Sequence, residues 1–362
     1  MQTLLTDESN SFKTNVERFT LTYFKNKEEI NLKDLWQFLF KEGFISETNS
    51  FFKNILLTEA ICKVEPACGL FLLTQFTCIE IIQKFGSKEL QETYLKKLTS
   101  GDSIACFSIT EPNAGSDVSM IETTGKKESK KWILNGHKIW ASNGSISDVI
   151  ITFAQTKSHK DKSGITCFIT DSKSKGTEII KDTPKLGVKI TPSNEIFFKN
   201  LELDEISQIG NIGDGIRIAL SAITLGRIFC SAQAIGLHEG ILEESIKHST
   251  KRNQFGKSIS ENQAIQWYIA DMSKDLDSGR LLLYKACFAN ENELGKLASM
   301  AKYFCTNAAC NHARNAVQIC GGSGLTENSY VSKAYRDSKV LEIYEGTNEI
   351  QKLILAKELK LN

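Results

Sequence analysis

The sequence lacks an excess of charge of either sign and lacks cysteines at metal-binding spacing. Its 44 basic residues balance 43 acidic ones to a net charge of +1, which argues against nucleic acid as a partner. Its 10 cysteines form no C-x-x-C pair and no cluster with histidine. We therefore expect reduced thiols, no disulfide framework and no metal site.

Long apolar runs are also missing. No segment reaches the roughly 20 consecutive apolar residues that span a bilayer. The first residues, MQTLLTDESNSFK, lack the apolar core of a secretory signal. These features predict a cytoplasmic protein that does not enter a membrane.

What the 362 residues do contain is a change of hydrophobic period along the chain. Helical periodicity fills residues 1–101, strand-like runs with Gly- and Lys-rich turns fill 102–205, and long helical segments return over 206–362. The pattern predicts an α+β multidomain protein with an N-terminal helical domain, a β-barrel-like middle domain and a C-terminal four-helix bundle. The four expected long helices lie near 214–250, 261–290, 293–320 and 347–360.

Within the β segment, KKWILNGHKIWASNG holds two β-rich runs around Asn135-Gly136. Asn-Gly between such runs is the strongest short-range hairpin signal. The sequence therefore predicts a hairpin turn at these two residues.

The stretch IYEGTNEIQ at 343–351 places one carboxylate, Glu345, just before a helix start. Thr347 can cap the helix that follows, so Glu345 is expected to project from a turn, where a general base would sit. An ordinary solvated glutamate before a helix is the alternative interpretation of so short a motif.

Two further segments could hold a planar polar ligand. FSITEPNAGSDVS at 107–119 offers the hydroxyls of Thr110 and Ser116 beside Gly115, where a ligand could approach the backbone. KIWASNG at 138–144 offers the flat ring of Trp140 and the hydroxyl of Ser142. A polar turn and a core tryptophan are the corresponding structural alternatives.

These pieces, in this order, resemble the acyl-CoA dehydrogenase family of flavoproteins from about Leu35 to Leu359. Two more strings carry the resemblance, AQAIGLHEGILEESIKHSTKRNQFGKSISENQAIQ at 232–266 and AVQICGGSGLTENSYVSKAYRDSKV at 316–340. The resemblance implies bound FAD, an acyl thioester substrate, an electron-transfer flavoprotein as partner, and a homotetramer or at least a homodimer.

The resemblance also implies roles for individual residues. The segment that lines the flavin and the thioester matches Phe107, Ile109, Thr110 and Ser116, and the pair that flanks the flavin ring matches Trp140 and Ser142. Contacts to the FAD diphosphate and adenosine across a subunit interface match Arg252, Gln254, Phe255, Gln318, Gly321 and Gly322. Further cofactor contacts match Thr347 and Glu349, and substrate contacts match Ser116, Arg227, Tyr344 and Gly346.

Glu345 stands where most of the family keeps its catalytic base. Another branch carries the base just before the arginine that matches Arg227, and here that position is Gly226. The implied reaction is α,β-dehydrogenation, in which Glu345 removes the α proton of the thioester. Burial under Tyr344 is expected to raise the pKa of Glu345 toward the operating pH.

Some features depart from the family. After LWQFLFKEGF the chain continues directly with ISETNSFFKNILLTEA, without the usual Pro/Gly-rich loop beside the substrate entrance. An acyl or aminoacyl group tethered to a carrier protein is therefore the alternative substrate to acyl-CoA. A catalytically silent scaffold paralogue is a third reading, and oxygen could replace the flavoprotein as electron acceptor.

Overall fold

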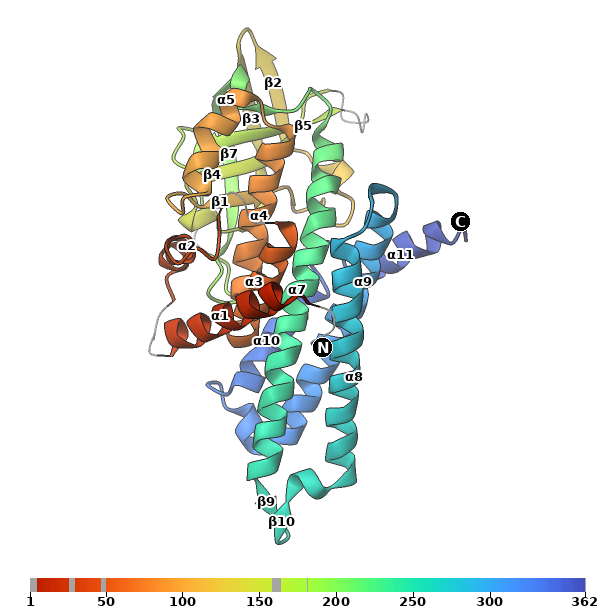
Figure 1. The fold of residues 1–362 in the computed structure, drawn as a ribbon. Helices are drawn as coiled ribbons and strands as arrows, with labels where there is room; N and C mark the ends of the chain where they lie inside the picture. The colour runs from red at the N-terminus through yellow and green to blue at the C-terminus, as the bar shows by residue number, and fades with distance from the viewer. Residues whose placement is uncertain (1–4, 26–29, 47–49, 158–163, 181, 362) are drawn as a thin grey trace.

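The computed structural model describes all residues except 1–4, 26–29, 47–49, 158–163, 181 and 362. Helices come first, a β-sheet follows, and long helices complete the chain (Figure 1). This order confirms the predicted fold class. The chain between α2 and α3, where the sequence analysis expects a family loop to be missing, lies partly outside the described residues.

The N-terminal helices form around local capping signals. Their bounds are α1 Asp7–Phe24, α2 Leu32–Lys41, α3 Phe51–Val64, α4 Cys68–Phe85, α5 Lys88–Leu90 and α6 Lys96–Leu98, with a π-helical turn, Gln91–Leu95, between the last two. Thr6, Asn31, Ser50 and Ser87 each accept a backbone N–H at a helix start. These side chains satisfy donors that a helix leaves unpaired at its first turn.

The middle segment forms a mixed sheet, and four of its strands pair in a closed ring. Its strands are β1 Ala105–Ser108, β2 Thr124–Glu128, β3 Lys131–Ser142, β4 Val149–Gln155, β5 Ile165–Asp171, β6 Thr177–Ile179, β7 Ser193–Asp204 and β8 Gln208–Ile209. The order is β6-β7-β3-β1-β4-β5-β8, and β2 pairs with both β3 and β4. Because β3 and β4 already flank β1, these four strands close a ring, as expected of a barrel-like domain. The sheet runs on through β8, just past the proposed boundary at 205.

The predicted hairpin at Asn135-Gly136 is wrong. β3 runs straight through both residues, and the turn that joins β2 to β3 lies at 129–130, where Ser129 has φ +56°. The β3–β7 register shifts between Leu134 and Gly136, so the glycine marks an irregularity within a strand. A Cβ on Gly136 would come within 2.2 Å of Thr123 Oγ1, so close backbone packing explains this glycine.

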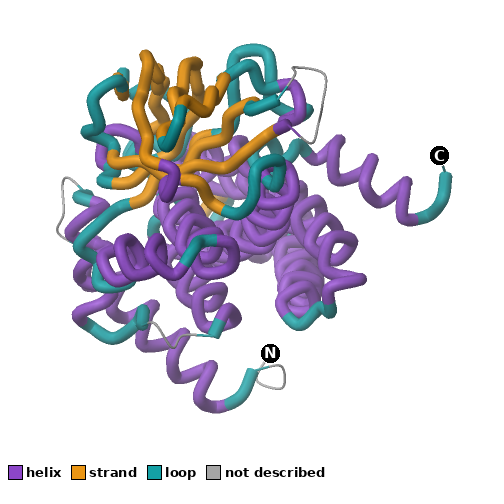
Figure 2. Tube along the Cα trace, turned by 90° about the horizontal axis from the view of Figure 1, so that it is seen from above, coloured by secondary structure: helices purple, strands orange, loops and turns teal. Residues whose placement is uncertain are grey.

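The C-terminal helices are α7 Gly215–Lys251, α8 Gln263–Cys287, α9 Glu291–Cys320, α10 Tyr330–Leu341 and α11 Asn348–Glu358. A small hairpin of β9 Asn253–Gln254 and β10 Lys257–Ser258 joins α7 to α8. The helical domain was predicted, but α10 was not. It packs against α7 and α9, whereas α11 lies against α9 and projects from the body toward the C-terminus (Figures 1 and 2).

Helix α7 is a long central helix. It runs from the β domain past α3 and α4 into the C-terminal bundle (Figure 1). By length and composition alone, both α4 and α7 could cross a membrane. However, 78% of the most apolar window of α4 and 72% of that of α7 are buried inside the protein. Such burial is typical of the core helices of a globular fold.

Candidate active site

Glu345 lies in the turn between α10 and α11, with φ +58°, and Gly346 follows at φ +82°. Thr347 caps α11, accepting the N–H of Ile350 at 3.2 Å, as the sequence predicted. The Gln351 amide donates to the carbonyl oxygens of Glu345 at 3.2 Å and Gly346 at 2.7 Å. A left-handed non-glycine residue is strained, and these bonds from Gln351 hold the strained turn in place.

The Glu345 carboxylate lies against the backbone of α7 at Gly226. A Cβ built on Gly226 would come within 2.3 Å of Glu345 Oε2 and 2.5 Å of its Cδ. The two alternative base positions therefore meet at one point in space, and the glycine leaves room for the carboxylate.

Arg227 is buried behind the turn, with 7% of its surface exposed. Its Nε donates to the Glu345 carbonyl oxygen at 3.3 Å, and its Nη1 donates to Ser299 Oγ at 3.5 Å on α9. The arginine therefore contacts the backbone of Glu345. A direct contact between Arg227 and substrate stays a prediction.

The surroundings shift the protonation of Glu345. Burial raises the pKa of its carboxyl to about 7, while the Arg227 and Lys302 charges oppose that rise. Solvent still reaches part of the residue, which is half-buried. A carboxyl with a pKa near neutral pH can both take up and release a proton there, as a general base must.

Lys302 and Asn348 belong to this site, although motif analysis did not find them. Lys302 Nζ is fully buried in α9 and donates to Asn348 Oδ1 at 2.9 Å, and Thr306 Oγ1 donates to the same oxygen at 3.0 Å. The signal was present in the sequence as a lysine inside the apolar run LASMAKYF. A buried lysine needs a polar partner, but one sequence does not say which.

Tyr344, the residue before Glu345, closes the site toward α4. Its hydroxyl donates to Gln233 Oε1 at 2.5 Å, and Gln233 Nε2 donates to the Pro66 carbonyl at 2.8 Å. A Cβ on Gly69 would meet the Gln233 side chain at 2.3 Å. The interior beside Tyr344 is therefore filled by a hydrogen-bonded amide.

The β domain brings together the two segments that sequence analysis singled out. Phe107 pairs with Ser142 across β1 and β3, and Ile139 N donates to the Thr110 carbonyl at 2.9 Å. Trp140 has φ +56° and is 56% exposed, so it is not a core tryptophan. Ile109 is buried and Ser116 is exposed.

The other expected cofactor residues lie far from this group. Arg252 ends α7, and Gln254 and the fully exposed Phe255 lie in the hairpin at the opposite end of α7 from the β domain (Figure 1). At 1.5 Å per residue, Arg252 lies about 39 Å along the helix from Gly226. Arg252 therefore lies far from Glu345, which contacts Gly226, within one chain.

A third group lies at the C-terminal end of α9, whereas the start of α11 lies apart from it, against Lys302 and Thr306 of the same helix. Gln318, Gly321 and Gly322 are exposed, and a Cβ on either glycine would meet no atom within 4 Å. Gly321 has φ +58° and ψ −140°, a conformation that favours glycine. Glu349 is exposed on the first turn of α11.

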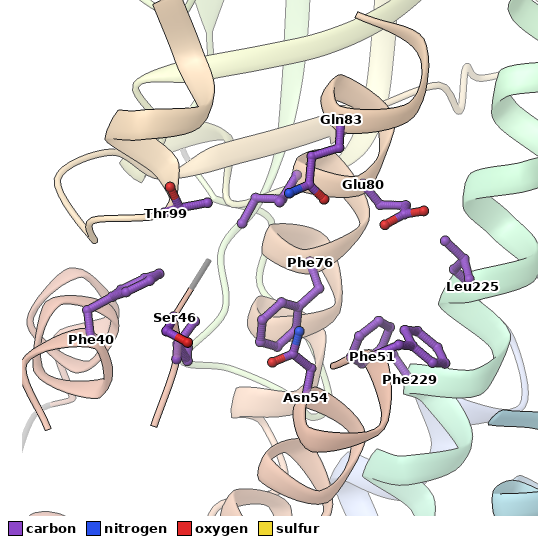
Figure 3. A pocket seen from close by; sticks show the side chains of 12 residues that line it. Phe40, Ser46, Phe51, Asn54, Phe76, Glu80, Gln83, Thr99, Leu225 and Phe229 are labelled. Carbon is purple, nitrogen blue, oxygen red and sulfur yellow. The ribbon is translucent and has the colours of Figure 1, made fainter. Parts of the chain in front are cut away.

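A cavity of ≈130 Å³ lies beside α7 where α2, α3 and α4 meet (Figure 3). It is lined by Phe40, Ile45, Ser46, Phe51, Asn54, Phe76, Ile79, Glu80, Gln83, Thr99, Leu225 and Phe229. Phe229 stacks on Phe76 at 5.1 Å and meets Phe51 edge-on at 5.5 Å. Pockets for whole ligands usually span about 300–1,000 Å³, so this cavity has room for a small group only.

Comparison with known proteins identifies the family to which this chain belongs. The family models for the N-terminal, middle and C-terminal domains of acyl-CoA dehydrogenase match residues 6–102, 106–201 and 213–360. An acyl-CoA dehydrogenase of Bacillus subtilis (strain 168) is 39% identical over 308 residues, 84% of this chain and 81% of that protein.

Two solved structures are similar over nearly their whole length. Butyryl-CoA dehydrogenase from Megasphaera elsdenii has a TM-score of 0.93 and 29% identity, covering 98% of this chain and 99% of that one. The prolyl acyl carrier protein oxidase AnaB has a TM-score of 0.93 and 28% identity, with the same coverage. These matches define an FAD-dependent oxidoreductase acting on a CH–CH bond. The chain belongs to the acyl-CoA dehydrogenase family.

The residues present fit FAD. The exposed Trp140 ring offers a flat surface for a flavin ring, and the open backbone at Gly321 and Gly322 admits a ligand. At the end of α7 an open concavity is lined by Glu244, Lys247, His248, Lys251 and Arg252. Its basic side chains suit a diphosphate, with which a guanidinium pairs in a bidentate manner.

Proposed function

We propose that this chain dehydrogenates an acyl-CoA thioester between the α and β carbons, with Glu345 as the base. One observation carries the proposal: the carboxylate of half-buried Glu345, with a pKa of about 7, lies against the glycine of the alternative base position. A solvated structural glutamate would have neither feature. The raised pKa also weighs against the silent-scaffold alternative, because strongly perturbed carboxyl groups cluster at functional sites.

The residues of the chain carry out the proton chemistry. Glu345 takes the α proton onto its carboxylate, and negative charge then develops on the thioester oxygen. Among the described residues none accepts a hydrogen bond from the Glu345 N–H, so this donor is available to that oxygen. FAD, when bound, supplies the oxidant that accepts the β hydrogen with its electron pair.

Other residues hold the ligands in this proposal. Phe107, Ile109, Thr110, Trp140 and Ser142 hold the flavin half of FAD from the β domain. Thr347 and Glu349 hold it from the start of α11. Substrate contacts are assigned to Ser116, Arg227, Tyr344 and Gly346.

The adenosine and diphosphate half is assigned to a neighbouring subunit. It is held there by Arg252, Gln254, Phe255, Gln318, Gly321 and Gly322. The separation of about 39 Å between Gly226 and Arg252 supports this division, because it places Arg252 far from the proposed reaction site of the same chain. The functional unit is then at least a homodimer and, by family resemblance, a homotetramer.

The proposal also covers the electron acceptor, the cellular compartment and a second candidate substrate. The electrons leave through an electron-transfer flavoprotein, and the enzyme works in the cytoplasm. A carrier-protein substrate is the second candidate. It is supported by the similarity to the prolyl acyl carrier protein oxidase and by the short connection between α2 and α3.

Anaerobic titration of the purified yellow protein separates these candidates. Acyl-CoAs and the same acyl groups on carrier proteins would be added in parallel, and flavin bleaching would be followed. Fast bleaching by acyl-CoA supports the first candidate, and fast bleaching by the tethered group alone supports the second. No bleaching by any thioester would contradict both.

A further inference from the structure

One buried ion pair of the β domain joins the two segments assigned to the flavin, 107–119 and 138–144. Lys138 Nζ lies 2.6 Å from Glu111 Oε1, and the two side chains are 0% and 3% exposed. No other salt bridge reaches either residue within the described part of the chain. Placing two charges out of water is costly, and a buried ion pair is often no more stabilising than apolar side chains of similar size. Stability alone therefore explains this pair poorly.

The position of the ion pair explains its presence better. Lys138 and Ile139 form hydrogen bonds or a salt bridge with three consecutive residues of the other segment, 109–111. Lys138 Nζ also donates to the Ile109 carbonyl at 3.3 Å, and Ile139 N donates to the Thr110 carbonyl at 2.9 Å. The salt bridge adds Glu111. Thr110 is thus held on both sides by bonds from β3.

Glu111 is in turn anchored to the chain that follows. Its carboxylate accepts the N–H of Glu122 at 2.5 Å and that of Thr123 at 3.0 Å. Its backbone exchanges two hydrogen bonds with Ala114, which closes the Pro-Asn turn. Burial by itself would raise the pKa of Glu111, but the Lys138 charge and these donors lower it overall, so the carboxylate is ionised at neutral pH.

On the other strand, Lys138 sits at the edge of a bulge. The β3–β7 register shifts between Lys138 and Ala141, so β3 carries one extra residue there. Trp140 lies in this bulge at φ +56°. A bulky residue in the left-handed region persists only where its surroundings over-determine it, and the Lys138 anchor provides such a constraint.

We propose that Lys138 and Glu111 are positioning residues for FAD, holding the Thr110 segment and the Trp140 bulge in one fixed relation. Neither side chain touches the flavin itself in this proposal, because both are buried. The inference rests on the proposed function, in which Thr110 and Trp140 face the flavin ring. It assigns to the pair a role in flavin geometry beyond its role in folding.

The test compares holoenzyme variants by two flavin readouts, the FAD dissociation constant and the visible circular dichroism of the bound flavin. Lys138→Met leaves a buried unpaired carboxylate and can fail to fold, so Glu111→Gln and the double variant Glu111→Gln/Lys138→Met accompany it. The matched control is Lys131→Met/Glu202→Gln, which removes an exposed pair at 2.8 Å between the same strand β3 and β7. Leu203→Ala, which opens a cavity in the same domain, controls for lost stability.

We expect the folded double variant to bind FAD at least tenfold more weakly, with an altered visible dichroism band. The Lys131 and Leu203 controls should keep wild-type values of both. A folded double variant with FAD affinity within twofold of wild type and an unchanged band would overturn the proposal. If the double variant does not fold, the dichroism of folded Glu111→Gln decides in the same way.

Trp140→Ala separates this inference from the proposed function. If Trp140→Ala changes the flavin band while the ion-pair variants do not, only the positioning role fails. If Trp140→Ala also leaves the band unchanged, the assignment of the flavin face fails, and the positioning role fails with it.

Discussion

Gly226 and Glu345 occupy neighbouring positions so close that a single methyl group on the glycine would overlap the carboxylate, at 2.3 Å from Oε2. The glycine lies within α7, and the glutamate follows 119 residues later in a turn. Their proximity explains why a base on either residue could serve the same substrate carbon.

The first prediction follows from that contact. Gly226→Ala should displace the Glu345 carboxylate and lower the rate of flavin reduction by on the order of 10- to 100-fold, since small displacements of reacting groups are costly. FAD content should not change. Stopped-flow reduction with a bleaching thioester measures the effect.

A base exchange is the matched variant. Glu345→Gly/Gly226→Glu should recover part of the activity that Glu345→Gly loses, and glycine also suits the φ of +58° at 345. Equal inactivity of the single and double variants would show that the two positions are not equivalent.

The pKa of about 7 for Glu345 predicts a pH dependence. The carboxylate must be ionised to accept a proton, so the rate of flavin reduction should rise through pH 7 and level off above it. Lys302→Met removes a positive charge that lowers the pKa of Glu345, so the midpoint should move to higher pH. Lys296→Met, an exposed lysine on the same helix, should leave the midpoint in place. A Lys302→Met midpoint at or below that of the wild type would contradict this.

The same pKa predicts a cost in stability. Burial raises the pKa of Glu345 from 4.5 to about 7, so the folded state loses stability as pH rises through this window. At 1.36 kcal/mol per pKa unit the loss is roughly 1–3 kcal/mol, because solvent reaches part of the residue. Glu345→Gln should therefore unfold at a higher temperature than wild type at pH 8.5, with little or no gain at pH 4.5. Differential scanning calorimetry at both pH values tests this, and an equal gain at both would point to another cause.

Arg252 should couple FAD binding to assembly. Arg252→Ala should weaken FAD retention and oligomer stability together, because the guanidinium is assigned to the diphosphate of a neighbour's FAD. Lys84→Ala, an exposed basic residue on α4 outside the concavity that Arg252 lines, is the control. Light scattering and flavin absorbance on the same samples measure both properties. A wild-type monomer with full FAD occupancy would rule the assignment out.

Local signals in the sequence predicted some elements well. Thr347 predicted the start of α11, and the period change predicted the order of domains, since both depend on neighbouring residues. Asn135-Gly136 led to a wrong hairpin prediction, because Asn-Gly favours a turn only where no tertiary contact requires the glycine. Here Thr123 packs against it, a contact between residues 13 positions apart.

Contacts across long stretches of chain could not be read from one sequence. Lys302 meets Asn348 across 46 residues, and Gly226 meets Glu345 across 119. Composition and periodicity carry no information on such pairs. The family resemblance placed Glu345, but only the packing of α7 against the turn explains its raised pKa.

The most direct test of the account is single-turnover flavin reduction in Glu345→Gln. Glutamine keeps the size and most of the hydrogen bonding of the side chain but cannot accept the proton. Substrate should still bind and perturb the flavin spectrum, while reduction slows by on the order of 10² to 10⁴ or more. Reduction at the wild-type rate in this variant would show that the base lies elsewhere and would contradict the proposed mechanism.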